Sequence, residues 1–503
     1  MAVALIAVLT LLAAAMLAPG LVVGPSLDAA VFTDVGGRML HGATPYLGAW
    51  DHKPPGIYLA TAGIQAVLGW LGPWTAAWLL SLVATVGIGV AVATVLARLG
   101  LTRWPRALAA LGATMVASHY LVALGGGLTE PPATALEAWA LVLAIRPVGG
   151  ARLAAIGGLA GLATLLSVLL LPGALIVLAL SVLRRSARAG VRGAALAALG
   201  FAAPLVAAGA WLMVTGAMPA AFDAVVTYAA AYRASSNDYG PALAGSVAAW
   251  TALVSLFLVA PALLGAASAS SHAGPRRVLV LGLGLWIGVS LASFLFQGRF
   301  YAHYAIALVV PVGILAGIGF ERVGQSLKRV DRPWQMTVIV LPFVATFLVS
   351  VVAGVVSGAL QVALVADGNA RADAVSARLR ELPAGTMLVW GNQPLLYSVA
   401  DRAPATRYSY LYPLTTRHYS TDAQIDEVAR ALADHPPAIV VDVGSAAPGL
   451  AGFLPLLIPR PIATDGRDLD LLDPLRAFVA DRYELDSIVS GWPIYVLRHA
   501  PVP

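Results

Sequence analysis

Long, mostly apolar stretches recur along the first 360 residues of this sequence and constrain its fold more than any other feature. Residues 2–23, 75–97 and 334–358 are three examples, and each is long enough to cross a bilayer core of about 30 Å as a helix. In lipid, only helices and closed barrels satisfy their own backbone groups. Charged residues make up 11% of the chain, against roughly 25% in a soluble protein. The sequence therefore predicts an α-helical polytopic membrane protein.

We predict about eleven transmembrane helices. The predicted spans are residues 2–23, 75–97, 105–123, 131–146, 152–168, 171–184, 193–215, 242–265, 278–296, 304–320 and 334–358. The first span resembles a signal peptide, but it lacks the basic residues that precede the apolar core of such peptides. We therefore interpret it as a retained transmembrane helix.

The charges between the spans predict the topology. Residues 55–71 are also apolar, but they are amphipathic and short, so they can lie in the membrane interface. With this segment at the outer interface, fifteen Lys and Arg residues before residue 360 fall on the cytoplasmic side and only four fall outside. Making it a span would reverse this positive-inside bias. We predict a multi-pass protein of the plasma membrane, with a cytoplasmic N-terminus and an extracytoplasmic C-terminal part.

The composition changes near residue 360 to that of a soluble domain. Sixteen of the 25 acidic residues lie beyond this point. Strand-like runs at 387–390, 438–443 and 494–497 alternate there with a helical stretch near 421–433. We predict a transmembrane domain, residues 1–359, whose first outer loop (24–74) carries interfacial helices. A small mixed α/β domain, residues 360–503, follows on the outer face.

Before residue 360, acidic residues are concentrated in the predicted outer segments. Residues 26–58 hold three aspartates and the pair His52–Lys53 between very apolar neighbours. Glu130 lies in a second outer turn, GGGLTEPP, and the segment QGRFYAHY (297–304) forms a third. Charge that faces lipid costs several kcal/mol, so these groups are expected to line a watery cavity. We predict that these three segments converge there with a fourth, the outer loop 218–241.

Acids and cations at one membrane face suit the transfer of a sugar from a lipid phosphate. An acid can accept the proton of an attacking hydroxyl. Lysine and arginine can bind the phosphate and stabilise the charge that grows on it as it leaves. This combination of residue types predicts a transferase, although a single acid or base would not.

The same segments resemble a known class of enzymes. The patterns Asp-x-x-Val-Phe (28–32), Gly-x-x-Pro-Tyr (42–46) and Asp-His-Lys-Pro-Pro (51–55) are similar to the first outer loop of the GT-C class of integral membrane glycosyltransferases. Protein O-mannosyltransferases and lipid A aminoarabinose transferases are the nearest well-described relatives. GRFYAHY (298–304) resembles a later motif of bacterial members. The resemblance covers about residues 1–360, and the C-terminal part matches only as a soluble outer domain.

The resemblance implies an inverting membrane glycosyltransferase with a polyprenyl-phosphate sugar donor and an extracytoplasmic glycan, lipid or protein acceptor. Asp28 takes the position of the catalytic base in this class. The predicted site comprises the catalytic acids Asp28 and Glu130, the phosphate-binding residues Lys53, Arg299 and His303, and the substrate-binding residues Asp51, His52, Tyr301, Tyr304 and Glu137. A divalent metal ion held by Asp28 and Glu130 is a further option, and no nucleotide cofactor is expected. Relatives often carry two adjacent acids where this chain has Asp28–Ala29, which weakens the metal option.

Each of these residues also has a structural interpretation. Asp28 and Glu130 are suited to capping helices, and Lys53 can extend to lipid headgroups. Asp51 and His52 can shape a turn, and Glu137 can be a hydrogen-bonded packing residue. We expect Asp34 to be solvated and His119 to be a core histidine. Four tyrosines are expected to belong mainly to the aromatic belts at the membrane surface: Tyr228, Tyr232, Tyr301 and Tyr304.

Two other functions fit a polytopic chain. A transporter or lipid flippase would bind its substrate near the bilayer midplane and often contains internal repeats. The sequence has no evident repeat, and most candidate groups lie at the outer edge. A non-catalytic scaffold whose outer domain binds partners is the third alternative. The glycosyltransferase remains the preferred prediction.

Overall fold

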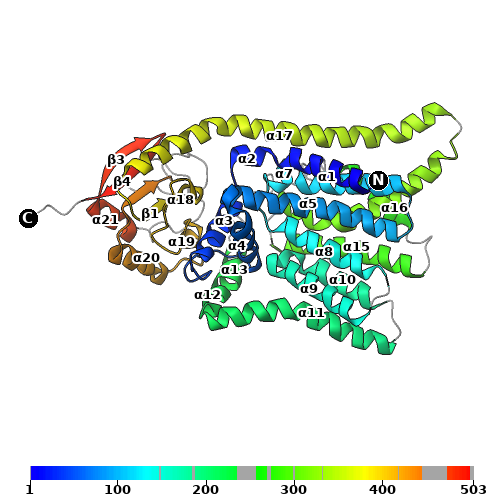
Figure 1. The fold of residues 1–503 in the computed structure, drawn as a ribbon, viewed down its shortest axis with the longest axis horizontal. Coiled ribbons are helices and arrows are strands. Elements are labelled where there is room, and N and C mark those ends of the chain that lie inside the picture. The colour runs from blue at the N-terminus through cyan, green and yellow to red at the C-terminus, as the bar shows by residue number, and fades with distance from the viewer. Residues whose placement is uncertain are drawn as a thin grey trace, which may run out of the picture.

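The computed structural model consists of a helical bundle with a four-stranded sheet at one end (Figure 1). It describes residues 2–146, 149–183, 187–234, 256–268, 274–297, 301–330, 332–416, 418–443 and 473–498. The predicted combination of a polytopic helical bundle with a small C-terminal α/β part is confirmed.

The bundle is built from long apolar helices and several shorter ones. Its elements are α1 (Ala2–Leu17), α2 (Pro19–Val23), α5 (Pro73–Arg98), α6 (Arg103–Ser118), α7 (Tyr120–Ala123), α8 (Glu130–Ala144), α9 (Gly150–Leu166), η2 (Val168–Leu170), α10 (Leu171–Val182), α11 (Ala187–Val214), α15 (Gly274–Gln297), η6 (Ala302–Leu308), α16 (Val309–Leu327) and α17 (Pro333–Glu381). Proline stands in the first turn of α5, α8, α10 and α17, where its missing N–H is not needed.

Six helical segments of the described chain are long and apolar enough to cross a membrane. They coincide with the predicted spans 2–23, 75–97, 193–215, 278–296, 304–320 and 334–358. The predicted spans between residues 105 and 184 correspond to shorter helices, and span 242–265 lies partly outside the described residues. The number of eleven spans stays a prediction.

Small residues let α9 and α11 approach each other closely. A Cβ atom added to Gly157 or Gly161 would collide with backbone carbonyls of α11, and one on Gly200 would collide with that of Ala154. Close approach of this kind is what drives helix association in lipid, because burial of apolar surface gives no advantage there.

Short helices lie between the bundle and the sheet (Figure 1). They are α3 (Leu27–Leu40), α4 (Gly56–Leu68), η1 (Gly69–Leu71), α12 (Met218–Phe222), the π-helical turn η3 (Asp223–Thr227) and α13 (Tyr228–Ala234). Helix α3 begins at a serine cap, because the Ser26 side chain accepts a hydrogen bond from the backbone N–H of Ala29. Gly36 of α3 packs directly on Thr61 of α4. Part of the predicted first loop is therefore helical, and Ser26 rather than Asp28 is the cap of α3.

The strands form one sheet in the order β1-β2-β4-β3. β1 (Met387–Trp390) pairs parallel with β2 (Ile439–Asp442), whereas β4 (Trp492–Leu497) is antiparallel to β2 and to β3 (Tyr483–Val489). The helices α18 (Leu395–Val399), α19 (Tyr412–Thr415), α20 (Asp422–Asp434) and α21 (Asp473–Arg482) accompany the sheet. We call the described residues from 382 to 498 the sheet region.

The three predicted strands and the helix near 421–433 are confirmed. β3 was not predicted, because most of its residues are not buried and it lacks the regular alternation of a half-buried strand. Helix α17 runs without interruption through residues 359 and 360, where the sequence predicts the domain boundary. That boundary stays a prediction.

Candidate active site

Four ionisable side chains from four segments lie close enough to interact electrostatically at the end of the bundle nearest the sheet. Asp28 is in the first turn of α3, Lys53 is in the loop before α4, Glu130 is the first residue of α8, and His303 is in η6. Lys53 interacts with the charges of Asp28 and Glu130. His303 interacts with Glu130, Asp28 and Lys53. Glu130 and His303 are buried. The structure thus brings together three of the four outer segments that the sequence predicts to converge.

Glycines in the GGGLTEPP turn allow this approach. Gly125, Gly126 and Gly127 all have positive φ angles, of 81°, 106° and 78°. Residues with a side chain rarely adopt such angles. A Cβ atom on Gly127 would lie 2.6 Å from the Cβ of Ala29, the neighbour of Asp28. The turn therefore lies directly against the start of α3, three residues before Glu130.

The charge of Lys53 is stabilised by these acids. Burial alone would lower the pKa of the Lys53 ammonium, but Asp28, Tyr304, Glu130 and Asp51 raise it above its ordinary value. Lys53 is therefore a fixed positive charge at physiological pH. A partly buried ammonium that interacts with two carboxylates is suited to binding an anionic group.

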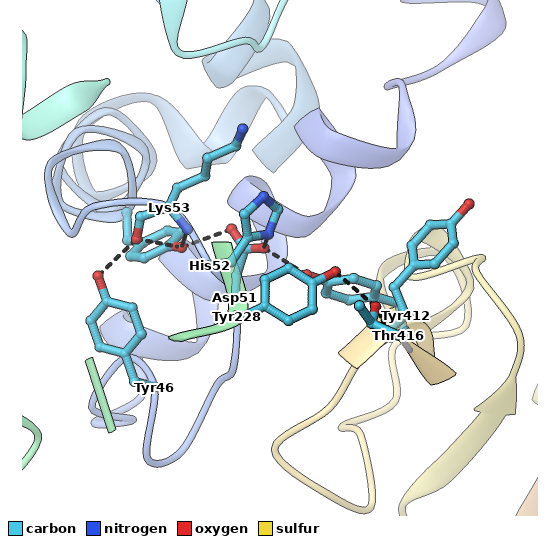
Figure 2. A network of polar contacts seen from close by, with 9 residues as sticks. Tyr46, Asp51, His52, Lys53, Tyr228, Tyr412 and Thr416 are labelled. Atoms are coloured by element: carbon cyan, nitrogen blue, oxygen red, sulfur yellow. Dashed lines mark hydrogen bonds and ion pairs between the residues drawn. The ribbon is translucent and has the colours of Figure 1, made fainter. Parts of the chain in front are cut away.

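Asp51 is the centre of a hydrogen-bond network beside Lys53 (Figure 2). Its Oδ2 accepts a 2.7 Å hydrogen bond from Tyr58 Oη, and its Oδ1 accepts one of 2.7 Å from Tyr410 Oη. His52 Nδ1 lies 3.1 Å from Oδ1, and it must carry the proton because the carboxylate only accepts. Burial would raise the pKa of Asp51, but the charge of His52 and the three hydrogen bonds hold it at about 2.

Tyr58 and Tyr46 hold the main chain of Lys53. Tyr58 Oη accepts a 3.0 Å hydrogen bond from the Lys53 N–H, and Tyr46 Oη donates one of 2.8 Å to the Lys53 carbonyl. In Figure 2 the Lys53 side chain extends away from the hydrogen-bonded Asp51 and His52. The backbone of Lys53 is thus fixed, and its ammonium lies close enough to the acids to interact with their charges.

Aromatic rings connect His52 to His303. The His52 ring centroid is 5.9 Å from that of Tyr232, and Tyr232 Oη lies 2.8 Å from Tyr301 Oη. The Tyr301 ring is stacked on His303 at 5.3 Å with an interplanar angle of 9°. The tyrosines expected in an aromatic belt therefore also join the loop that carries Lys53 to η6.

The sheet region contributes residues that the sequence did not indicate. Besides Tyr410, the carbonyl of Arg407 accepts a 2.8 Å hydrogen bond from the Trp50 N–H. Arg407 Nη1 in turn donates to the Tyr46 carbonyl at 3.1 Å. These residues are more than 350 positions away from the loop in the sequence, and no local motif connects them to it.

Of the other predicted site residues, Glu137 lies away from this cluster and Arg299 cannot be placed. Glu137 is fully buried between helices of the bundle, and a Cβ on Gly173 would lie 2.7 Å from its Oε1 and 2.5 Å from Trp286 Nε1. It lies seven residues, about 10 Å, along α8 from Glu130. Its role in substrate binding stays a prediction, and this placement favours packing. Arg299 lies outside the described residues.

Two expectations about other polar residues have clear outcomes. The expectation that Asp34 is solvated is wrong: it is 9% exposed, because the sheet region covers that face of α3. Burial raises the pKa of Asp34 to about 6, although Arg38 lowers it. His119 is a core histidine as expected: its Nδ1 accepts from the Leu121 N–H and its Nε2 lies 3.1 Å from the Ser350 carbonyl oxygen.

The predicted metal ion does not fit the residues at this site. In the described part of the chain, no group of three or more His, Asp, Glu or Cys side chains is arranged to hold a metal ion. Asp28 and Glu130 instead have the ammonium of Lys53 as their neighbouring cation. A second cation beside it would be repelled, so we assign no metal to these acids.

The fold is that of the GT-C class of integral membrane glycosyltransferases, and the chain is a multi-pass membrane protein. It is similar to ArnT from Cupriavidus metallidurans in the apo state, with a TM-score of 0.53, 15% sequence identity and coverage of 94% of this chain and 93% of that one. The likeness to the same ArnT bound to undecaprenyl phosphate has a TM-score of 0.51 at 14% identity, covering 98% and 97%. No protein-family model and no curated protein sequence matches this chain. The GT-C resemblance is thus confirmed at the level of the fold.

Proposed function

We propose that this protein is a membrane glycosyltransferase that moves a sugar from a polyprenyl-phosphate donor to an extracytoplasmic acceptor. The observation that carries the proposal is the ammonium of Lys53 beside Asp28 and Glu130, at the end of a bundle with the GT-C fold. The similar ArnT structure that contains undecaprenyl phosphate supports a lipid-linked donor. Nucleotide sugars are confined to the cytoplasm, so a site on the outer side would need such a donor.

Lys53 and His303 are the proposed ligands of the donor phosphate, with Arg299 as a further cation. The Lys53 ammonium carries a full positive charge, which the charges of Asp28 and Glu130 stabilise. Negative charge on the bridging oxygen grows in the transition state, when the bond from the anomeric carbon to the phosphate breaks. A fixed positive charge at that point lowers the barrier more than it strengthens ground-state binding.

Asp28 is the proposed general base. The acceptor hydroxyl attacks the anomeric carbon, its proton passes to the Asp28 carboxylate, and the electron pair of the broken bond leaves with the polyprenyl phosphate. One displacement inverts the anomeric configuration. Glu130 is proposed to place the acceptor and to balance the charge of Lys53.

The test is sugar transfer in purified membranes with a labelled polyprenyl-phosphate sugar. Asp28→Asn removes the base but keeps the size of the side chain, and transfer should fall by about 10²- to 10⁴-fold. Asp426→Asn is the matched control, because Asp426 is an exposed acid on α20 and should leave transfer unchanged. Wild-type transfer in the Asp28→Asn variant would exclude this mechanism. Movement of label into vesicles without a covalent product would favour the transporter instead.

A further inference from the structure

One contact of the sheet region with the loop of Lys53 is a buried hydroxyl. Tyr410 Oη donates a 2.7 Å hydrogen bond to Asp51 Oδ1, and the two residues are 4% and 2% exposed. They are 359 positions apart in the sequence. Hydrogen bonds to a charged group are among the stronger ones in proteins. Removing the donor from a buried carboxylate is also costly, because no water can take its place.

Both carboxylate oxygens of Asp51 are engaged within the protein. Tyr410 and His52 bind Oδ1, and Tyr58 binds Oδ2. Asp51 therefore has little capacity left to bind substrate. Its arrangement suits a different task, which is to orient the donors around it.

The network leads from Asp51 directly to Lys53. Tyr58 Oη, held by Asp51, accepts the N–H of Lys53 at 3.0 Å. Tyr46 Oη holds the carbonyl of Lys53, and the Tyr46 carbonyl is held in turn by Arg407 of the sheet region. The sheet region is thus connected to the Lys53 backbone by two routes. One runs through Tyr410, Asp51 and Tyr58, and the other runs through Arg407 and Tyr46.

We infer that Tyr410 is a positioning residue that sets the Lys53 ammonium for the donor phosphate. The sheet region would then be part of the donor site. This inference rests on the proposed function. A phenylalanine at position 410 would fill almost the same space as the tyrosine. The substitution Tyr410→Phe therefore tests the orienting hydrogen bond alone.

The experiment compares Tyr410→Phe with Tyr495→Phe. Tyr495 is a buried tyrosine of the same sheet region whose hydroxyl has no hydrogen-bond partner among the described residues, so its removal controls for the loss of a buried hydroxyl. Donor and acceptor KM and kcat are measured for both variants. Tyr410→Phe should raise the KM for the polyprenyl-phosphate sugar about five- to tenfold and leave the acceptor KM unchanged. Tyr495→Phe should match wild type.

A second readout does not depend on catalysis. Hydrogen–deuterium exchange of residues 44–58 should be faster in Tyr410→Phe, because the backbone N–H groups of Trp50 and Lys53 are bonded through this network. Tyr58→Phe removes the donor to the other oxygen and should give the same change. It takes the place of Tyr410→Phe if that variant does not fold.

The possible failures can be told apart. If wild type transfers sugar and Tyr410→Phe keeps both its donor KM and its exchange rates, the positioning role is wrong. A lower kcat with unchanged donor KM and unchanged exchange rates of residues 44–58 also overturns it, since that combination is the sign of a smaller fraction of active protein. If wild type transfers no sugar, the proposed function fails and the donor role of Tyr410 fails with it.

Discussion

Tyr419 donates a 2.6 Å hydrogen bond to Asp223 Oδ2 and so joins the sheet region to the π-helical turn before α13. The ring of Tyr419 also packs against Tyr228 and Trp50, at centroid distances of 4.9 Å and 6.2 Å. The sheet region therefore contacts two separate segments between the bundle and the sheet, which are the Lys53 loop and the helices of residues 218–234. Contacts at two places limit rocking of the sheet region against the bundle and preserve the geometry of the site.

Lys53 provides the sharpest test of the anion site. Lys53→Met keeps the length of the side chain but removes the charge, and transfer should fall at least about 100-fold. Lys53→Arg keeps the charge and should retain part of the activity, since a guanidinium also binds phosphate but is larger. Donor binding measured with the polyprenyl phosphate alone should weaken in the same order. Equal binding by all three proteins would contradict the role of Lys53.

Gly127 tests how closely Glu130 must approach α3. Gly127→Ala adds a Cβ where Ala29 and Trp74 lie 2.6 Å and 2.7 Å away, and it also forces alanine to a φ of 78°. Gly42→Ala is the matched control, with a φ of 90° but no heavy atom within 4 Å. The strained φ costs about 1–2 kcal/mol in both variants. Gly127→Ala should lower the melting temperature further and lose most of the transfer activity. Equal losses in both would show that the approach to Ala29 is unimportant.

Because the carboxyl group of Asp34 is buried, we expect its contribution to the stability of the fold to fall as the pH rises. Burial raises its pKa to about 6 in the folded protein, so the folded state holds this proton more tightly than the unfolded state does. Stability contributed by the neutral acid is present below about pH 4 and is lost as the pH rises through about 6. Asp34→Asn avoids this loss and should be more stable than wild type at pH 8, by up to about 3 kcal/mol.

Thermal unfolding in detergent from pH 5 to pH 8 measures this difference. The stability gap between Asp34→Asn and wild type should widen as the pH rises. Asp422→Asn is the control, because Asp422 is an exposed acid in the first turn of α20 and should show no such trend. A gap that stays constant or narrows with rising pH would show that Asp34 is ionised without penalty.

The proposed topology can be tested with single cysteines, because the natural chain has none. Asp434→Cys lies at the end of α20 in the sheet region, and Arg103→Cys lies at the start of α6. Both positions are exposed. In intact cells, a membrane-impermeant maleimide should label position 434 and should label position 103 only after lysis. Labelling of position 103 in intact cells would reverse the proposed orientation.

Local patterns predicted much of this fold correctly. The apolar spans matched six long helices because hydropathy over about twenty residues is a property of the segment itself. The strands β1, β2 and β4 were likewise visible as short apolar runs. The motifs around Asp28, Lys53 and Glu130 also pointed to residues whose charges interact in the structure, since charge in an apolar sequence has few stable positions.

Sequence patterns could not show which distant segment covers a residue. Asp34 has the spacing of a solvated helical residue, but the sheet region buries it. Glu137 shares a helical face with Glu130, yet it lies in the packed bundle against Gly173 because the helix carries it about 10 Å further. For both residues the helical spacing predicted the correct face of the helix. It could not identify the segment that packs against that face.

The amino-acid sequence by itself determined the membrane-spanning character of the chain, its main helices and the kinds of groups available for chemistry, because these depend on residues close together along the chain. Only the tertiary structure decided which groups surround Lys53 and how its loop is held. The bond from Tyr410 to Asp51 joins residues 359 positions apart. Such a contact depends on how the sheet region packs against α3, α4 and α13, and no local periodicity encodes that packing.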